Sequence, residues 1–292
     1  MHGMSGFLTA AIQNLPAWSR LFTPRKSGRD NSVDWDEGFE RVPTQGVVPF
    51  ERCDTKHANP DHRPTQAQYE RYIWLLQHFR SLGWDNRSLH DASPFRIVDP
   101  GFNGILLRSV AEVAELADAL GEVEIAKQSR ARLEKGISAF DVLWNEEIGQ
   151  FTCFDRAAGY HVNSKSIAGL LAVFAPLQTQ TTDKIASQLR NLSERVNFSV
   201  PSHDPADPRF DEKRYWRGPV WLIVNYMITE GLRRAGHADI ADKIEQDSLN
   251  LIEKAGFAEY YDPFDGTPCG GGQFTWTAAM VIEFLNRPKG TE

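Results

Sequence analysis

Cysteine is scarce in this chain of 292 residues, which contains Cys53, Cys153 and Cys269. They are widely spaced and form no CxxC pair, so neither a zinc knuckle nor a disulfide framework is indicated. Basic runs are lacking as well, and the net charge is -7. Because binding to a phosphate backbone needs clustered lysine and arginine, no nucleic-acid partner is expected.

Long apolar runs are also missing, and no stretch of 18 apolar residues predicts a membrane span. At the N-terminus, Gln13, Asn14, Pro16 and Arg20 interrupt the apolar positions, so the continuous apolar stretch of a signal peptide is lacking. The histidines form no i, i+4 ligand pair. We therefore expect a cytoplasmic protein with no membrane contact, metal or other cofactor.

What the sequence does contain is helical periodicity. Apolar residues recur at three- and four-residue spacing in 65–82, a segment that begins after Pro64 and stops at Gly83. The segment 105–120 and the one that follows it toward Leu143 predict a helical hairpin joined at Gly121. Two further hairpins are predicted, one pairing 164–174 with 182–192 and one pairing 219–235 with 238–255, and a last helix is predicted over 274–285.

Strand-like alternation is rare, so the predicted class is all-α, built from successive hairpins. Such hairpins form either an open solenoid or a closed toroid. The chain has no repeat with a period of 20 to 50 residues, which disfavours the solenoid. Long polar connectors at 42–64 and 197–214 favour the toroid, in which loops on one rim build a site, because loops of this length are usually functional.

Two acidic residues stand in unusual surroundings. Asp30 lies in the segment SGRDNS and Glu259 in GFAEYY, while YWRGPVW at 215–221 brings two indoles, a phenol and a guanidinium together. Carboxylates framed by aromatic rings are what sugar hydrolysis requires. Each also has a structural alternative: Asp30 as a helix or turn cap, Glu259 as a solvated charge, and Trp216 with Trp221 as core packing.

Four ordered segments carry a family resemblance from Ser27 to Leu285: SGRDNSVDWD, SPFRIVDPGFN, YWRGPVWLIVNY and GFAEYYDPFDGTPCGGGQFTWTAA. They resemble glycoside hydrolase family 63, including its small cytoplasmic members that hydrolyse glucosylglycerate and mannosylglycerate. Within the second segment, Asp99 and Asn103 are expected to cap the following helix. The chain departs from the family pattern at Val33, where a proline usually follows DNS.

The resemblance implies an (α/α)6 toroid of the six-hairpin glycosidase type and an inverting mechanism, with Asp30 as the acid and Glu259 as the base. The implied function is hydrolysis of the α-glycosidic bond in a small glucosyl or mannosyl compound such as glucosylglycerate or mannosylglycerate. Another α-glucosidase or a trehalase-like enzyme on the same fold is the alternative. The expected substrate-binding residues are Asn31, Tyr215, Trp216, Arg217, Gly218, Trp221, Gln273 and Trp276.

Single residues in this set keep further interpretations. Arg217 has a structural alternative, as the partner of a buried carboxylate such as Asp30 or Asp36. If the aglycone is glycerate, its carboxylate needs a cation, for which Arg29, Arg214 and Arg217 are the candidates.

Length adds one more expectation. About eight helices are predicted from Thr65 onward, fewer than a six-hairpin toroid needs, so we expect a toroid incomplete at its N-terminus. Residues 1–26 are expected to be the remnant of a missing N-terminal half or an irregular lead-in, and 27–287 the glycosidase domain. The expected partners are a small sugar substrate and either a second copy or the missing half, and a catalytically weak fragment is a further alternative.

Overall fold

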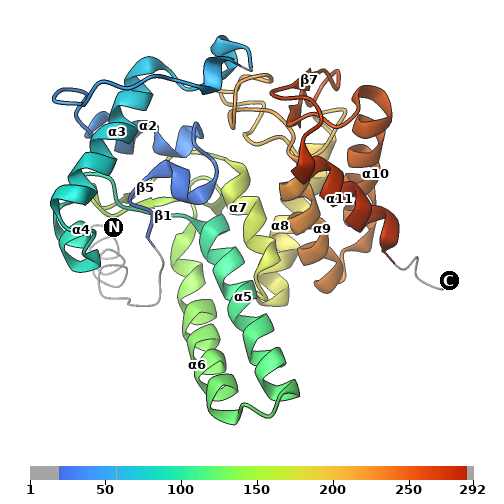
Figure 1. The fold of residues 1–292 in the computed structure, drawn as a ribbon. Helices are drawn as coiled ribbons and strands as arrows, with labels where there is room; N and C mark the ends of the chain where they lie inside the picture. Colours follow the sequence, from blue (N-terminus) through green and yellow to red (C-terminus); the bar gives the residue numbers. More distant parts are fainter. Residues whose placement is uncertain (1–19, 57, 288–292) are drawn as a thin grey trace. The chain divides into compact units, whose positions relative to one another are not determined.

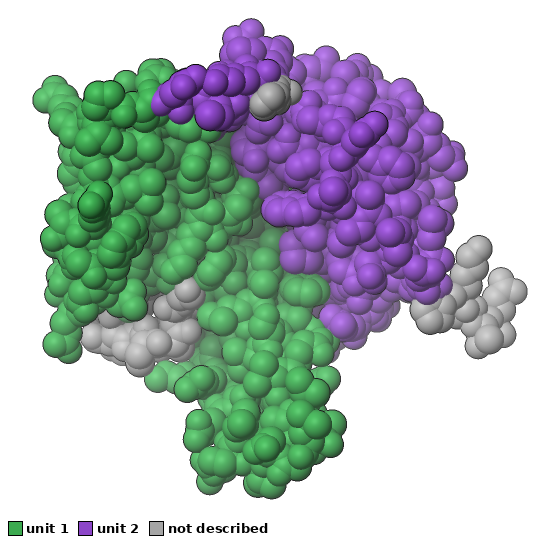
Figure 2. All heavy atoms as spheres, viewed as in Figure 1, with its two compact units in different colours: residues 1–50, 65–178 green, residues 51–64, 179–292 purple. Residues whose placement is uncertain are grey.

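The computed structural model describes residues 20–56 and 58–287, and within them the chain is mostly helical (Figure 1). The chain divides into two compact units (Figure 2). Unit 1 comprises 1–50 with 65–178, and unit 2 comprises 51–64 with 179–292. Most of the lead-in expected at 1–26 lies outside the described residues.

Unit 1 contains the predicted hairpin that is joined at Gly121. A capping box between Thr65 and Gln68 begins its long helix α3, close to where the sequence predicted it. Short 3-10 helices lie at Pro24–Ser27 and Val33–Trp35. Among the described residues of unit 1, the α-helices are α2 (Asp36–Glu40), α3 (Gln66–Ser81), α4 (Asn86–Ala92), α5 (Pro100–Ala119), α6 (Val123–Phe140) and α7 (Ile167–Leu171).

Helices α5 and α6 form the predicted hairpin and lie side by side in Figure 1. Helix α5 begins earlier than the apolar pattern indicated, because Asp99 caps it: the Asp99 Oδ1 atom accepts hydrogen bonds from the backbone of Gly101 at 2.8 Å and Phe102 at 3.2 Å. Pro100 follows the cap, where its missing N–H costs nothing. The predicted cap at Asp99 is confirmed, whereas Asn103 is not a cap: it lies inside α5, where its Nδ2 donates to the Asp99 carbonyl at 2.9 Å.

Two-residue strands hold the start of the described chain in place. Strand β4 (Phe154–Asp155) pairs with both β1 (Ile97–Val98) and β5 (Tyr160–His161), all antiparallel. Leu21 forms an isolated bridge with Ile97, and strands β2 (Trp144–Asn145) and β3 (Gln150–Phe151) form a second pair. One core cluster of unit 1 includes Leu21, Trp35, Phe39, Tyr72, Leu75, Phe79, Phe95 and Ile97.

Unit 2 packs helix α9 against both α10 and α11. Its helices are α8 (Thr179–Ser193), α9 (Leu222–Arg234), α10 (Ala238–Ala255) and α11 (Thr275–Asn286). Strand β6 (Tyr260–Tyr261) pairs with β7 (Pro268–Cys269), and Val220 bridges both Pro201 and Tyr261. The predicted bounds of α10 are confirmed.

Two expectations differ from the structure. Segments 164–174 and 182–192 were expected to pair with each other, but within their own units α7 packs on α5 and α8 packs on α10. Helix α4 was not predicted. Closure of a six-hairpin toroid stays a prediction. None of the described helices combines the length and the apolar character that a bilayer span needs.

Candidate active site

Asp30 lies in a tight loop of unit 1 whose geometry depends on glycine. Gly28 has φ +76°, a left-handed conformation that a side chain disfavours. The Tyr72 hydroxyl donates a hydrogen bond to the backbone carbonyl of Asp30. The Asp30 side chain is 23% exposed, and its Oδ2 lies 3.6 Å from the Arg25 Nε atom. The loop therefore fixes the backbone of Asp30 and leaves its carboxyl partly open to solvent.

The neighbouring amide, Asn31, is 1% exposed. Among the described residues neither its Nδ2 nor its Oδ1 atom has a hydrogen-bond partner. A buried polar group without a partner costs about 1–3 kcal/mol. An unpartnered amide directly beside Asp30 is therefore expected if Asn31 binds a ligand or an ordered water.

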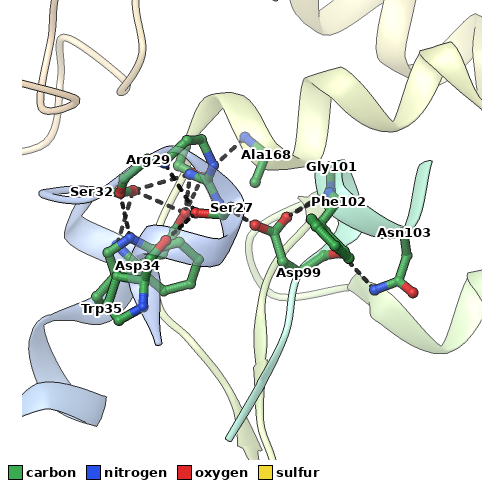
Figure 3. Close-up of polar contacts among 12 residues, drawn as sticks. Ser27, Arg29, Ser32, Asp34, Trp35, Asp99, Gly101, Phe102, Asn103 and Ala168 are labelled. Carbon is green, nitrogen blue, oxygen red and sulfur yellow. Dashed lines mark hydrogen bonds and ion pairs between the residues drawn. The ribbon is translucent and has the colours of Figure 1, made fainter. Parts of the chain in front are cut away.

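Arg29, on the other side of Asp30, is fully engaged with protein carboxylates. Its Nη1 lies 2.6 Å from Asp34 Oδ2 and its Nη2 lies 2.7 Å from Asp99 Oδ2 (Figure 3). These two ion pairs disfavour Arg29 as the cation that binds a carboxylate of the aglycone.

Glu259 directly precedes strand β6 in unit 2 and is 9% exposed. Its Oε2 atom accepts hydrogen bonds from Arg63 Nη2 at 2.9 Å and from the Gly271 N–H at 3.2 Å. Gly270 has φ +74°, and a Cβ atom there would lie 2.3 Å from the same oxygen. Glu259 is thus a buried, held carboxylate, and the alternative of a solvated charge is wrong.

Arg63 is a site residue that sequence reasoning missed. Its guanidinium carbon lies 4.6 Å from the centre of the Tyr215 ring, so it bridges Glu259 and an aromatic side chain. Burial lowers the pKa of Arg63, but the Glu259 carboxylate outweighs it and the pKa lies above its ordinary value. The only sequence signal was its position in the long connector 42–64, which was expected to be functional.

Aromatic rings form a continuous stack next to this ion pair. Trp216 and Trp221 stack at 4.0 Å with nearly parallel planes, and Trp221 stacks on Tyr260 at 4.8 Å. Tyr215 meets Trp221 and Tyr260 edge-on. Within the described part of the chain, the two indole N–H groups and the Tyr260 hydroxyl are buried without a hydrogen-bond partner. Three such polar groups in one stack of rings indicate a site that exchanges hydrogen bonds with a ligand.

Arg217 and Gly218 have clear backbone roles in the same segment. A Cβ atom at Gly218 would lie 2.3 Å from the Asp211 carbonyl oxygen, so only glycine fits there. The buried Arg217 accepts a backbone hydrogen bond from the Asp211 N–H at 3.1 Å. Both residues hold the loop that carries the tryptophans, and direct contact with a sugar stays a prediction.

Gln273 and Trp276 lie at the start of helix α11. Gln273 is exposed and has φ +55°, which is uncommon for a residue with a side chain. Trp276 lies on the first turn of α11, as predicted, and is 55% exposed. Its open ring contrasts with the buried rings of Trp216 and Trp221, so it has free surface on which a sugar ring could stack.

The predicted residues thus fall into two groups. Asp30 and Asn31 belong to unit 1, whereas Glu259, Gln273, Trp276 and the 215–221 segment belong to unit 2. That both groups face one cleft stays a prediction. Among the described residues no group of three or more histidine, cysteine, aspartate or glutamate side chains is arranged to hold a metal ion.

A mostly helical chain with a buried, arginine-paired carboxylate under stacked aromatic rings fits the class of glycoside hydrolases. The chain belongs to the mannosylglycerate hydrolase MGH1-like glycoside hydrolase domain family, whose model matches residues 19–277.

Two curated relatives support this assignment. The mannosylglycerate hydrolase of Thermus thermophilus is 40% identical over 262 residues, which are 89% of this chain and 62% of that protein. Mannosylglycerate hydrolase MGH1 of Selaginella moellendorffii is 39% identical over 263 residues, 90% of this chain and 54% of that protein. The chain therefore spans between about half and two thirds of the length of these relatives.

A solved structure agrees with the fold. The crystal structure of the family 63 mannosylglycerate hydrolase from Thermus thermophilus in complex with Tris superposes with a TM-score of 0.88 at 36% identity. The match covers 97% of this chain and 68% of that one.

Proposed function

We propose that this chain carries the catalytic residues of an inverting glycoside hydrolase whose substrate is mannosylglycerate. The observation that carries the proposal is Glu259, a buried carboxylate held by Arg63 and by the Gly271 N–H beside a stack of aromatic rings. Two relatives with about 40% identity are named for mannosylglycerate, which supports this substrate over glucosylglycerate.

In this proposal Asp30 is the general acid and donates a proton to the glycosidic oxygen. Its partly exposed carboxyl can be covered when the substrate binds, which would favour the protonated form. Glu259 is the general base and removes a proton from the water that attacks the anomeric carbon from the opposite face. The proposed fold for this chemistry is the (α/α)6 toroid.

Arg63 holds the general base, so in this proposal its charge is on the face of the sugar that water attacks, opposite the leaving glycerate. Its Nη2 atom holds Glu259, while its Nε atom is buried and has no hydrogen-bond partner in the described part of the chain. One donor of the guanidinium therefore remains for the attacking water or for a sugar hydroxyl. A charge-assisted bond of this kind is about twice as strong as one between neutral groups.

Hydrolysis assays with matched variants test the proposal. Mannosylglycerate should be hydrolysed faster than glucosylglycerate, trehalose and kojibiose. Asp30→Asn and Glu259→Gln should each lower kcat by about 10²- to 10⁴-fold, whereas Glu253→Gln on the exposed face of α10 should not change it. Unchanged turnover in Glu259→Gln would remove it from the mechanism, and a preference for trehalose would move the enzyme to the trehalase-like alternative.

A further inference from the structure

Arg29 is the centre of a buried ionic network in unit 1. It is 4% exposed, and its two terminal nitrogens bind different carboxylates, Asp34 at 2.6 Å and Asp99 at 2.7 Å (Figure 3). Both carboxylates are buried, and the Ser32 hydroxyl also lies 3.1 Å from Arg29 Nη1. An arginine in this geometry cannot move without breaking several charge-assisted bonds.

Each carboxylate is in turn tied to the start of a helix. Asp99 uses its other oxygen to cap α5. Asp34 accepts a hydrogen bond from the Ser166 hydroxyl at 2.6 Å, and the same hydroxyl accepts the backbone N–H of Ala168 at the start of α7. The guanidinium therefore links its own loop to two helices that are distant in sequence.

The backbone on both sides of Asp30 is held by the same region. The Arg29 N–H donates to the Ser27 hydroxyl at 3.1 Å, and the Arg29 carbonyl accepts the Trp35 indole N–H at 2.5 Å. On the following residue, the Tyr72 hydroxyl donates to the Asp30 carbonyl. On Arg29 and Asp30 these bonds involve only main-chain atoms, so none of them uses the Asp30 carboxyl.

We propose that Arg29 is a positioning residue for the catalytic acid, and that the Arg29–Asp34–Asp99 network sets the direction of the Asp30 carboxyl. The proposal rests on the function proposed above. Stability alone does not explain the network, because replacing buried ion pairs by apolar side chains of similar volume is often neutral or stabilising. The network is explained if its directional bonds fix the Asp30 loop relative to the starts of α5 and α7.

The test compares two arginine-to-lysine changes in unit 1. Lysine keeps the charge but cannot bridge two carboxylates as a planar guanidinium does. Arg29→Lys should lower kcat by about 10²-fold, the effect of a small misplacement of a catalytic group, with little change in KM. Arg41→Lys is the matched control, because Arg41 also pairs with a buried carboxylate, Asp155, outside the proposed site.

Hydrogen exchange of the peptide 27–36 gives a readout that does not depend on activity. It should become faster in Arg29→Lys and stay unchanged in Arg41→Lys. If Arg29→Lys does not fold, Asp99→Asn serves instead, since the amide keeps the oxygen that caps α5 and replaces the charged acceptor that faces Arg29 by an N–H donor.

Three outcomes would overturn the proposal: a loss of kcat no larger than in Arg41→Lys, a loss confined to KM, or unchanged exchange of the peptide. If the unmodified chain does not hydrolyse mannosylglycerate, the proposed function fails. Exchange of the peptide then decides by itself whether Arg29 holds the Asp30 loop.

Discussion

The substitution Gly270→Ala probes the Glu259 site without removing a polar group. Gly270 has φ +74°, and a Cβ atom there would lie 2.3 Å from Glu259 Oε2, 2.7 Å from Glu259 Cβ and 2.8 Å from a ring carbon of Tyr260. The left-handed backbone costs an alanine about 1–2 kcal/mol, and the overlap about 1–3 kcal/mol more. We expect a loss of roughly 2–5 kcal/mol in the free energy of unfolding, partly offset because alanine restricts the unfolded chain.

Two other glycines separate these contributions. Gly236 has φ +86° with no heavy atom within 4 Å of a Cβ, so Gly236→Ala tests backbone strain alone. Gly271 has no such neighbour and no positive φ, so Gly271→Ala should be nearly neutral. Urea unfolding followed by circular dichroism should show Gly270→Ala as the least stable variant, Gly236→Ala as intermediate and Gly271→Ala as the most stable.

The same variant should lose activity beyond its loss of stability. Relief of the overlap must move Glu259 or Tyr260, and a displacement of about 1 Å costs about 10²-fold in turnover. Hydrolysis of mannosylglycerate at a temperature where all three variants are folded is the assay. If Gly270→Ala matched Gly271→Ala in both stability and kcat, the close packing around Glu259 would be refuted.

Three shorter predictions concern Trp216, Asp34 and the turn between α5 and α6. Trp216→Ala should raise KM for the sugar, and unchanged KM and kcat would reassign the ring to core packing. Burial raises the pKa of Asp34, but the Arg29 guanidinium outweighs it and holds the pKa below its ordinary value. The ionised Asp34 therefore contributes to the free energy of unfolding in full above about pH 4, and this contribution is lost on further acidification. In urea titrations the free energy of unfolding of Asp34→Asn should therefore fall less on acidification than that of the unmodified protein, and an equal fall would contradict this. The α5–α6 turn exposes Leu120 and Val123, at 69% and 75%, and should promote self-association. Leu120→Glu should reduce this association in sedimentation experiments, and unchanged association would contradict a role of this surface.

The long helices could be predicted from the sequence because their burial follows a local period. Helix α10 places Ile240, Ile244 and Leu251 on its buried face, and its predicted bounds agree with the structure. Helix α4 has a single buried residue, Leu89, which gives no period to detect. Its start depends on a hydrogen bond from the Ser88 N–H to the Asp85 side chain, and an aspartate is equally common in turns.

The candidate site was predictable only as far as its motifs reach. Asp30 and Glu259 stand out in their segments, whereas Arg63 is separated from Glu259 by 196 positions and is marked only by its place in the connector 42–64. Such a pairing is decided by tertiary packing, which also places 51–64 in unit 2, whereas the sequence neighbours on either side belong to unit 1. The role of Arg29 was hidden for the same reason, since Asp99 lies 70 positions away.

The most direct test of the central claim is the separation of the two carboxyl groups in a crystal structure of this chain with mannose bound. An inverting pair predicts side-chain oxygens of Asp30 and Glu259 about 6.5–9.5 Å apart, on opposite faces of the sugar ring. A separation beyond about 12 Å, well outside that range, or a mannose that contacts neither carboxylate, would contradict the account.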